Sequence, residues 1–202
     1  MSVLGPLGNA FPIQVQKRNA WLVSGGVGLP PMLWLAEALA KARKSTIAFC
    51  GARSRDLLPL ALTPGSLPSS TASSAERCVE EFARVGVKAV ISTDDGSLGY
   101  PGHIGAAMQA YHEANAVATD DVVVYTCGPE RMIRFVAEYC VARQIECHVC
   151  MERNMACGTG LCQSCVVPIR DESAIDGWRY RLCCTDGPVF SAESILWESP
   201  AR

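Results

Sequence analysis

Short apolar runs alternate with stretches of helical spacing over most of the chain. The apolar runs are typical of buried strands, and they fall at residues 21–24, 46–50, 88–92, 121–125 and 145–150. Between them, apolar residues recur at helical spacing. This predicts one helix that begins near residue 30, a second over about 76–85, and a third that follows the strand at 121–125 and ends near residue 142. This order of strand and helix predicts an α/β fold with a parallel sheet.

The pattern changes after residue 150. Only two short strand candidates follow, at residues 166–169 and 178–182, and the apolar tail at 189–197 offers cover for them. We therefore expect three parts: a linker segment at 1–19, an α/β domain at 20–150 and a small domain with short β-strands at 151–202. Residues 62–75 are small, polar and proline-bearing, which predicts a mobile surface loop.

Composition narrows the function classes. The 202 residues are 49% hydrophobic with a net charge of −2 and no basic run, so neither nucleic acid nor an anionic membrane is an expected partner. No apolar run is long enough to span a membrane and the N-terminus lacks signal-peptide features, which predicts a cytoplasmic protein. The 11 cysteines are an odd number, which argues for reduced thiols with some committed to metal.

Three cysteines carry the strongest chemical signal. Cys157, Cys162 and Cys165 are spaced C-x4-C-x2-C, which matches the spacing of plant-type [2Fe-2S] clusters. Gly158 and Gly160 allow the backbone to turn successive N–H groups toward a negatively charged cluster. The alternatives are zinc, which usually takes two CxxC pairs, and buried thiols without a ligand.

The spacing leaves the fourth cluster ligand open, because Cys183 and Cys184 are adjacent and point opposite ways in extended chain. Residues 152–165 and 184–190 resemble the C-terminal cluster domain of the electron-transfer subunit of NAD-dependent dihydroorotate dehydrogenase. In that family the ligand cysteine stands just before Asp-Gly-Pro-Val-Phe. The resemblance therefore implies Cys184 as the fourth ligand and Cys183 as a packing residue.

A glycine turn follows the first predicted strand. Gly25, Gly26 and Gly28 lie between that strand and the first helix, where backbone N–H groups and the helix dipole favour a pyrophosphate. The run Gly26-x-Gly28-x-x-Pro31 ends in proline where the dinucleotide fingerprint has glycine, so a plain tight turn is the alternative.

The choice between NAD and NADP depends on two later loops. Arg53 and Arg55 stand where the fingerprint places an acidic residue, so they either leave room for a phosphorylated cofactor or are solvated. Asp94, with Gly96 in the same turn, follows the third strand and can accept ribose hydroxyls, unless it serves as a helix N-cap. The run Thr-Asp-Asp-Gly-Ser-Leu-Gly also occurs in the resembled family, and it favours NAD.

Cys127, Gly128 and Pro129 follow the fourth strand. Reductases of the ferredoxin-NADP reductase superfamily carry a similar Cys-Gly-x-x-x-Met element, so the resemblance implies that Cys127 lies by the nicotinamide and that Gly128 and Pro129 shape the ribose pocket. Without that resemblance, Cys127 is a structural cysteine. Cys147 and Cys150 form a CxxC within a strand, where they face opposite sides, and we expect them to pack in the core.

The N-terminal run Gly5-Pro-Leu-Gly8 also resembles the family. There it joins a flavin-binding barrel to the nucleotide domain and lies by the flavin, but here no barrel precedes it. Three explanations stay open: the barrel is another polypeptide, the start codon is placed too far downstream, or the chain is a degenerate copy.

The resemblance implies a ferredoxin-reductase-type NAD domain followed by a [2Fe-2S] domain, serving as an electron-transfer subunit in pyrimidine biosynthesis. Electrons would pass between an FMN-containing catalytic subunit, the cluster, FAD and NAD(H), with FAD shared with or supplied by the missing barrel. No residue is expected to act as a general base, because the cofactors carry the redox chemistry. The alternatives are a subunit of another NAD(P)H-linked oxidoreductase and a non-enzymatic cluster module that docks to a partner.

Overall fold

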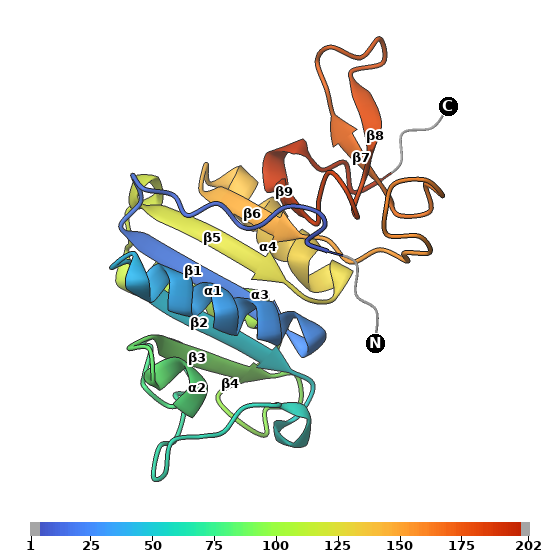
Figure 1. Ribbon diagram of the computed structural model, residues 1–202. Helices are drawn as coiled ribbons and strands as arrows, with labels where there is room; N and C mark the ends of the chain where they lie inside the picture. The colour runs from blue at the N-terminus through green and yellow to red at the C-terminus, as the bar shows by residue number, and fades with distance from the viewer. Residues whose placement is uncertain (1–4, 199–202) are drawn as a thin grey trace.

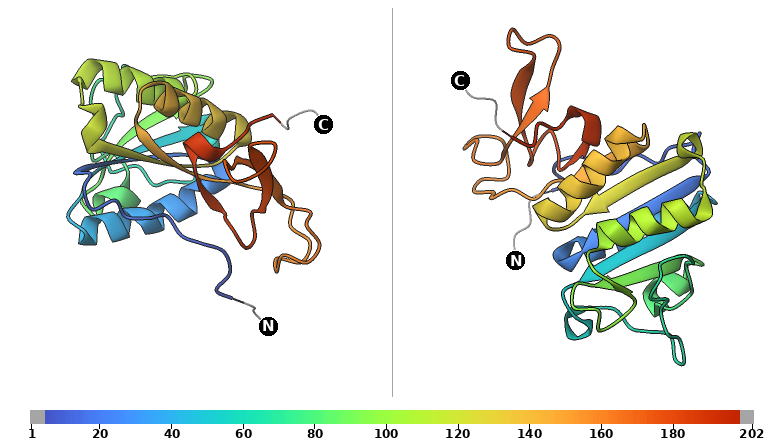
Figure 2. Two further views of the ribbon diagram at one scale, coloured as in Figure 1. Left: turned by 90° about the horizontal axis from the view of Figure 1, so that it is seen from above. Right: turned by 180° about the vertical axis from the view of Figure 1, so that it is seen from behind.

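The computed structural model describes residues 5–198, which form a seven-stranded sheet with helices on both faces (Figures 1 and 2). The strand order is β4-β3-β2-β1-β5-β6-β9, and every neighbouring pair is parallel except β6 with β9. The strands of this sheet are β1 (Asn19–Gly25), β2 (Ser45–Ala52), β3 (Lys88–Thr93), β4 (Tyr100–Pro101), β5 (Val122–Cys127), β6 (Glu146–Cys150) and β9 (Val189–Ser191). The predicted α/β fold with a parallel sheet is confirmed.

Four α-helices are present among the described residues: α1 (Leu29–Lys41), α2 (Glu80–Ala83), α3 (Ile104–Asn115) and α4 (Glu130–Ala142). The two faces of the sheet have separate cores, because successive side chains along a strand point to opposite sides. In β1, Leu22 packs on the α1 face, while Trp21 packs on the α3 and α4 face against Phe49, with 5.6 Å between ring centroids. None of these helices is both long and apolar enough to cross a membrane.

The predicted helix over 76–85 is wrong in its extent. Only Glu80–Ala83 is helical, because the residues before it pair with neighbouring chain: Glu76 exchanges backbone hydrogen bonds with Ala89, and Val79 forms a β-bridge with Leu62. The loop at 62–75 is also held in places, since the Ala72 side chain is completely buried. Tertiary pairing therefore overrides the helical spacing of this stretch.

Residues 151–182 project from one end of the main body (Figure 1). Strands β7 (Val166–Arg170) and β8 (Trp178–Leu182) form an antiparallel hairpin of their own, close to the predicted positions. β9 was not predicted as a strand; it adds to the edge of the main sheet beside β6 and so ties the C-terminal segment to it.

The N-terminal segment, residues 5–18, runs across the sheet on the α1 side and reaches the C-terminal segment (Figure 1). The Tyr125 hydroxyl on β5 donates to the Pro12 carbonyl at 2.7 Å, and the Phe11 ring packs edge-on against Tyr125. At its end, Arg18 forms an ion pair with Asp121 at 3.0 Å. The segment therefore joins parts of the chain that are distant in sequence.

Candidate functional site

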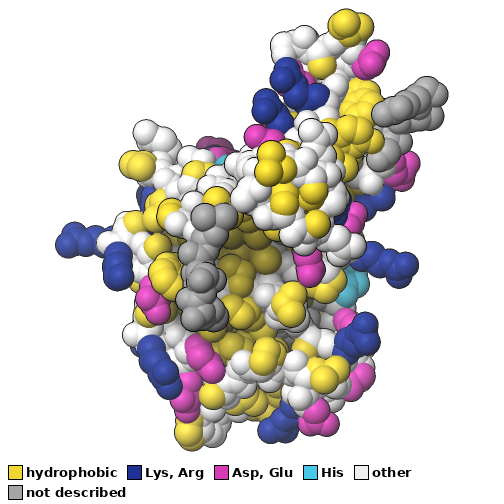
Figure 3. Space-filling model, turned by 45° about the vertical axis from the view of Figure 1, so that its right-hand side comes forward, with side chains coloured by type: hydrophobic (Ala, Val, Ile, Leu, Met, Phe, Trp, Pro, Cys, Tyr) yellow, Lys and Arg dark blue, Asp and Glu magenta, His cyan; other side chains and the backbone are white. Residues whose placement is uncertain are grey.

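The glycine turn and the Cys127 element meet at the carboxyl edge of the sheet. β1 and β5 are neighbours in the sheet, but the chain leaves β1 toward β2 on one side and reaches β6 from β5 on the other. This reversal is the topological switch point at which open α/β sheets bind ligands. Figure 3 brings this edge forward and shows a hollow lined with hydrophobic side chains.

The two segments at this edge touch through their backbones. A Cβ on Gly28 would lie 2.0 Å from the Cys127 carbonyl oxygen, and a Cβ on Gly128 would lie 2.8 Å from the Gly25 carbonyl oxygen. Glycine is therefore required at both positions for β1 and β5 to end side by side. The structure brings Gly25, Gly26 and Gly28 together with Cys127, Gly128 and Pro129. Residues that bind the same nucleotide have to lie close together in this way.

The start of α1 completes this edge. A short 3-10 helix at Gly26–Gly28 leads directly into α1, which has proline in its first turn and no side-chain cap. Gly26 has a φ of +54° and a Cβ there would meet nothing within 4 Å. Pro30 and Pro31 carry no N–H and the Leu29 N–H donates to the Gly26 carbonyl, so the donors for a phosphate group have to come from the glycine turn itself, with the helix dipole beside it.

The acidic pair after β3 divides into two roles. The Asp95 carboxylate accepts hydrogen bonds from the Ser97 hydroxyl at 2.6 Å and from the Ser97 N–H at 2.9 Å, and these bonds lower the pKa of Asp95. Among residues 5–198, no hydrogen bond involves the Asp94 carboxylate. Residues 94–99 form turns and bends rather than a helix start, so the N-cap alternative for Asp94 is wrong. Asp94 is therefore free to accept hydroxyl groups of a ligand.

The loops after β2 and β3 lie together. The Asp94 N–H donates to the Ala52 carbonyl at 3.0 Å, and the Arg55 N–H donates to the Ser97 hydroxyl at 2.8 Å. Gly96 has a φ of +73°, which the tight turn requires. The acidic turn after β3 and the two arginines after β2 thus lie side by side at the carboxyl edge of the sheet. β2 is one strand away from the glycine turn after β1, and β3 is two strands away.

Cys127 has a neighbour that the sequence did not reveal. Cys150 stands opposite it in the register of the parallel strands β5 and β6, and both thiols are half-buried. A hydrogen bond from the Cys150 thiol lowers the pKa of Cys127 and raises that of Cys150. The expectation that Cys150 packs in the core is therefore replaced by a thiol pair, whereas Cys147 is buried beside Cys140 on the other face. Strand register was the missing information.

The four candidate cluster ligands lie on loops of the C-terminal segment. Cys157 and Cys162 are exposed, while Cys165 and Cys184 are buried. Among residues 5–198, no three histidine, cysteine or acidic side chains are gathered closely enough to hold a metal ion. The candidate ligands are thus on neighbouring loops, but their sulfurs do not form a compact group in this arrangement.

The donor chemistry of these loops fits an anionic cluster. The backbone N–H groups of Cys162 and Thr159 both point at the Cys157 sulfur at 3.4 Å, and they lower the pKa of Cys157 to about 6. Positive φ angles of +71° at Gly158 and +86° at Gly160 produce this turning of the backbone. A thiol that is ionised near neutral pH and surrounded by N–H donors is suited to ligate iron.

Cys183 and Cys184 have different surroundings. The Cys183 thiol is fully buried and donates to the Met151 carbonyl at 3.2 Å, so it is engaged within the fold. Burial and the neighbouring Cys165 thiol raise the pKa of Cys184. Both cysteines thus lie near Cys165, and they differ in that the Cys183 thiol is already engaged with the Met151 carbonyl. Cys184 as the fourth ligand stays a prediction of the resemblance.

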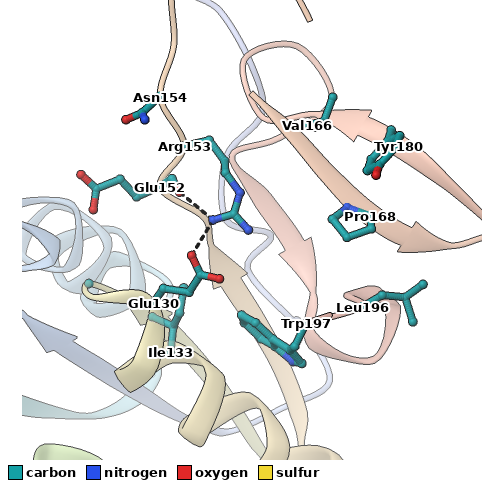
Figure 4. A pocket seen from close by; sticks show the side chains of 11 residues that line it. Glu130, Ile133, Glu152, Arg153, Asn154, Val166, Pro168, Tyr180, Leu196 and Trp197 are labelled. Atoms are coloured by element: carbon teal, nitrogen blue, oxygen red, sulfur yellow. Dashed lines mark hydrogen bonds and ion pairs between the residues drawn. The ribbon is translucent and has the colours of Figure 1, made fainter. Parts of the chain in front are cut away.

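A pocket of about 620 Å³ opens between α4 and the β7–β8 hairpin (Figure 4). Its wall carries an ion pair of 2.8 Å between Arg153 and Glu130, with Trp197 and Ile133 beside it. Gly128 also lines the pocket, so this space adjoins the carboxyl edge of the sheet where the glycine turn and Cys127 meet. Sequence reasoning missed it, because its residues come from segments far apart in the chain.

Gly5 and Gly8 are not in contact with the glycine turn after β1. The nearest atoms to a Cβ on Gly8 belong to Gly187, Pro188 and Cys184, and a Cβ on Gly5 would meet only Leu7. The structure therefore places Gly8 against the loop of the fourth candidate ligand.

Family models match two parts of the chain. Residues 22–138 match the oxidoreductase NAD-binding domain, and residues 152–196 match the iron-sulfur cluster binding domain of dihydroorotate dehydrogenase B. These matches confirm the resemblance that the motifs indicated.

The similar curated proteins include electron transfer subunits of dihydroorotate dehydrogenase B (NAD(+)). That of Desulforamulus reducens is 28% identical over 98% of this chain and 66% of its own length. That of Caldanaerobacter subterraneus subsp. tengcongensis is 32% identical with the same coverage, and that of Geobacillus kaustophilus is 32% identical over 97% of this chain and 65% of its own length. The chain thus spans just under two thirds of the length of these relatives.

One solved structure is similar over nearly the whole chain. It is a chain from the structure of an NADH-dependent reduced ferredoxin-NADP oxidoreductase, described in a study of flavin-based electron bifurcation. The TM-score is 0.73 at 26% identity, covering 98% of this chain and 60% of that one. The predicted ferredoxin-reductase-type fold with a cluster domain is thereby confirmed.

Proposed function

Since the chain belongs to the oxidoreductase NAD-binding domain family, we propose that it is an electron-transfer subunit that carries electrons between NAD(H) and a [2Fe-2S] cluster. One observation carries the proposal: the carboxyl edge with Gly25, Gly26, Gly28 and Cys127, here called the nucleotide edge, and a four-cysteine segment occur in the same chain, joined through β6. The proposed division is a linker at 1–19, a nucleotide domain at 20–150 and a cluster domain at 151–202.

At the nucleotide edge, the chain binds and orients the dinucleotide. N–H groups at Gly25, Gly26 and Gly28 hold the pyrophosphate, and Asp94 accepts hydrogen bonds from a ribose. Cys127, Gly128 and Pro129 border the nicotinamide end, where the backbone contact between β1 and β5 fixes the floor of the site. Gly96 maintains the turn that presents Asp94.

In the C-terminal segment, Cys157, Cys162, Cys165 and Cys184 hold the cluster. When bound, a [2Fe-2S] cluster accepts and releases one electron at a time. The backbone N–H groups of Thr159 and Cys162 stabilise its negative charge at the Cys157 side, and Cys165 and Cys184 shield the other side from water. Burial and N–H donors of this kind tune the reduction potential.

A hydride from NADH carries two electrons, so a flavin is needed between the nucleotide and the cluster. We propose that FAD binds beside Gly5 and Gly8. A flavin-binding barrel domain would share the FAD with this chain or supply it. The names of the relatives support a dihydroorotate dehydrogenase-like subunit as the partner, and we propose that this subunit contains FMN. The second candidate is another NAD(P)H-linked oxidoreductase, which the similarity to the reduced ferredoxin-NADP oxidoreductase favours.

The experiment is a visible absorption spectrum of anaerobically purified protein, with flavin extraction, iron analysis and an NADH titration. We expect cluster bands, saturable binding of NADH, and bleaching by NADH only when FAD is bound. Protein without iron, or without saturable NADH binding, would contradict the proposal. Reduction by dihydroorotate with an added dihydroorotate dehydrogenase subunit, compared with reduction by reduced ferredoxin, separates the two candidate partners.

A further inference from the structure

Asn9 connects the N-terminal segment to the loop that follows Cys184. Its side-chain amide donates to the carbonyls of Val189 at 2.8 Å and Asp186 at 3.1 Å, and its side-chain oxygen accepts from the Val189 N–H at 2.9 Å. Its own backbone N–H donates to the Gly187 carbonyl at 2.6 Å. Four hydrogen bonds from one residue thus hold residues 186–189, which are more than 170 positions away.

Asparagine suits this position for a chemical reason. The site requires two donors and one acceptor on the same short side chain, which an amide provides. Aspartate keeps only the acceptor, and its carboxylate would face two carbonyl oxygens. The backbones also touch here, because Gly8 has a φ of +72° and a Cβ on it would lie 2.5 Å from the Gly187 carbonyl oxygen.

The held loop carries the fourth candidate ligand at its start. On its inner side, the Asp186 carboxylate accepts from the Leu182 N–H at 2.7 Å, and the N–H groups of Asp186 and Gly187 donate to the Leu182 carbonyl. On its outer side, Asn9 supplies the bonds to Asp186, Gly187 and Val189. Cys184 therefore stands in a turn that is fixed from two directions.

We propose that Asn9 is a positioning residue: it fastens the Cys184 loop to the segment bearing Gly5 and Gly8, and so sets the place and the solvent exposure of the fourth cluster ligand. This inference rests on the proposed function, in which Cys184 ligates the cluster. Without Asn9, the freed carbonyls and the Val189 N–H bind water, and the loop moves away from the N-terminal segment. Water near a cluster sulfur changes its reduction potential and hastens its loss.

The test compares Asn9→Ala and Asn9→Asp with the wild type in the cluster-loaded protein. Three quantities are measured: the midpoint potential from a dye-mediated redox titration, the rate at which visible absorbance decays in air, and the melting temperature. Gln14→Ala is the matched control, because the Gln14 side chain bonds to His148 on β6 and not to residues 184–189. Asn9→Asp preserves the shape of the side chain but replaces its donors with a negative charge, whereas Asn9→Ala removes the hydrogen bonds without adding charge.

We expect both Asn9 variants to lose the cluster roughly five- to tenfold faster, which corresponds to the loss of about one net hydrogen bond, and to shift its potential. Gln14→Ala should keep both properties of the wild type. If Asn9→Asp and Asn9→Ala both match the wild type, or if Gln14→Ala has the same effect as they do, the inference is wrong. A wild-type protein that binds no cluster would instead refute the proposed function.

Discussion

The nucleotide edge and the cluster loops are built in opposite ways. At the nucleotide edge, the site is a consequence of buried strands: most of β1 is completely buried, and Gly28 after it is pressed against the end of β5. In the C-terminal segment, no residue of β8 is buried, and two of the four candidate ligands are exposed. The first region is stable through its core. The second adds Val167 and Ile169 of β7 to that core, but β8 and the exposed Cys157–Cys162 loop depend more on what the cysteines bind.

Removing a ligand should have the largest effect, and only in the second region. We expect Cys184→Ser to abolish the visible cluster absorbance and to lower the amide hydrogen-exchange protection of the β7–β8 hairpin, because a bound metal centre stabilises the segment that ligates it. Protection of β1, β2 and β5 should stay close to that of the wild type, since the core on the α1 face contains no residue of the C-terminal segment and the core on the other face is built mainly by the sheet, α3 and α4.

Cys183→Ser is the matched control for this variant. The Cys183 thiol is buried and donates to the Met151 carbonyl, so its replacement should keep the absorbance. The reverse result, with Cys183 required and Cys184 dispensable, would mean that the choice of the fourth ligand is wrong. Loss of hydrogen-exchange protection throughout the main sheet in Cys184→Ser would mean that the sheet, too, depends on the cluster for its stability.

Overfilling the nucleotide edge should affect the first region and spare the second. In Gly28→Ala the new Cβ would overlap the Cys127 carbonyl oxygen, so β1 and β5 must separate at the site, at a cost of about 2–3 kcal/mol in the free energy of unfolding. We expect a lower melting temperature. We also expect at least about tenfold weaker NADH binding by fluorescence titration, because displacing the turn should remove about 1.4 kcal/mol or more of the binding free energy. Cluster absorbance should not change.

Gly26→Ala separates steric overlap from backbone strain. A Cβ there meets nothing within 4 Å, so only its positive φ opposes the substitution, at about 1–2 kcal/mol. A Gly28→Ala protein that is as stable as wild type and binds NADH normally would show that the backbone contact does not shape the site.

We expect the smallest effect from a substitution that removes one contact to the nucleotide and leaves the fold of the nucleotide edge intact. Asp94→Ala should weaken NADH binding about tenfold, because a hydrogen bond to a charged group is lost, and should leave the melting temperature unchanged. Equilibrium titration with NADH measures the first quantity and thermal unfolding the second. Unchanged affinity would exclude Asp94 from the ribose site.

Asp95→Ala serves as the control, since this carboxylate bonds to Ser97 within the turn. We expect it to lower the melting temperature. Because the folded pKa of Asp95 is lowered, its stabilising contribution is present above the ordinary aspartate pKa and is lost as the pH falls through the lowered value. The difference in stability between wild type and Asp95→Ala should therefore shrink in acid.

Local pattern was sufficient for much of the fold. The buried strands appear as apolar runs, so β1, β2, β3, β5 and β6 were predicted to within about two residues, as was the β7–β8 hairpin. The helix predicted over 76–85 was wrong, because backbone pairing of Glu76 and Val79 with distant chain replaced helical hydrogen bonds. Cysteine spacing identified the candidate ligands, since cluster geometry demands it.

What the sequence determined by itself is therefore the chemistry that neighbours along the chain can share: strand and helix type, the glycine turn and the cysteine spacing. Only the tertiary structure decided which distant groups meet. It paired Cys127 with Cys150 through strand register, assigned Asp95 to the turn and left Asp94 free, and set Asn9 on the Cys184 loop. Such contacts depend on register and on long-range packing, which no local pattern of residues specifies.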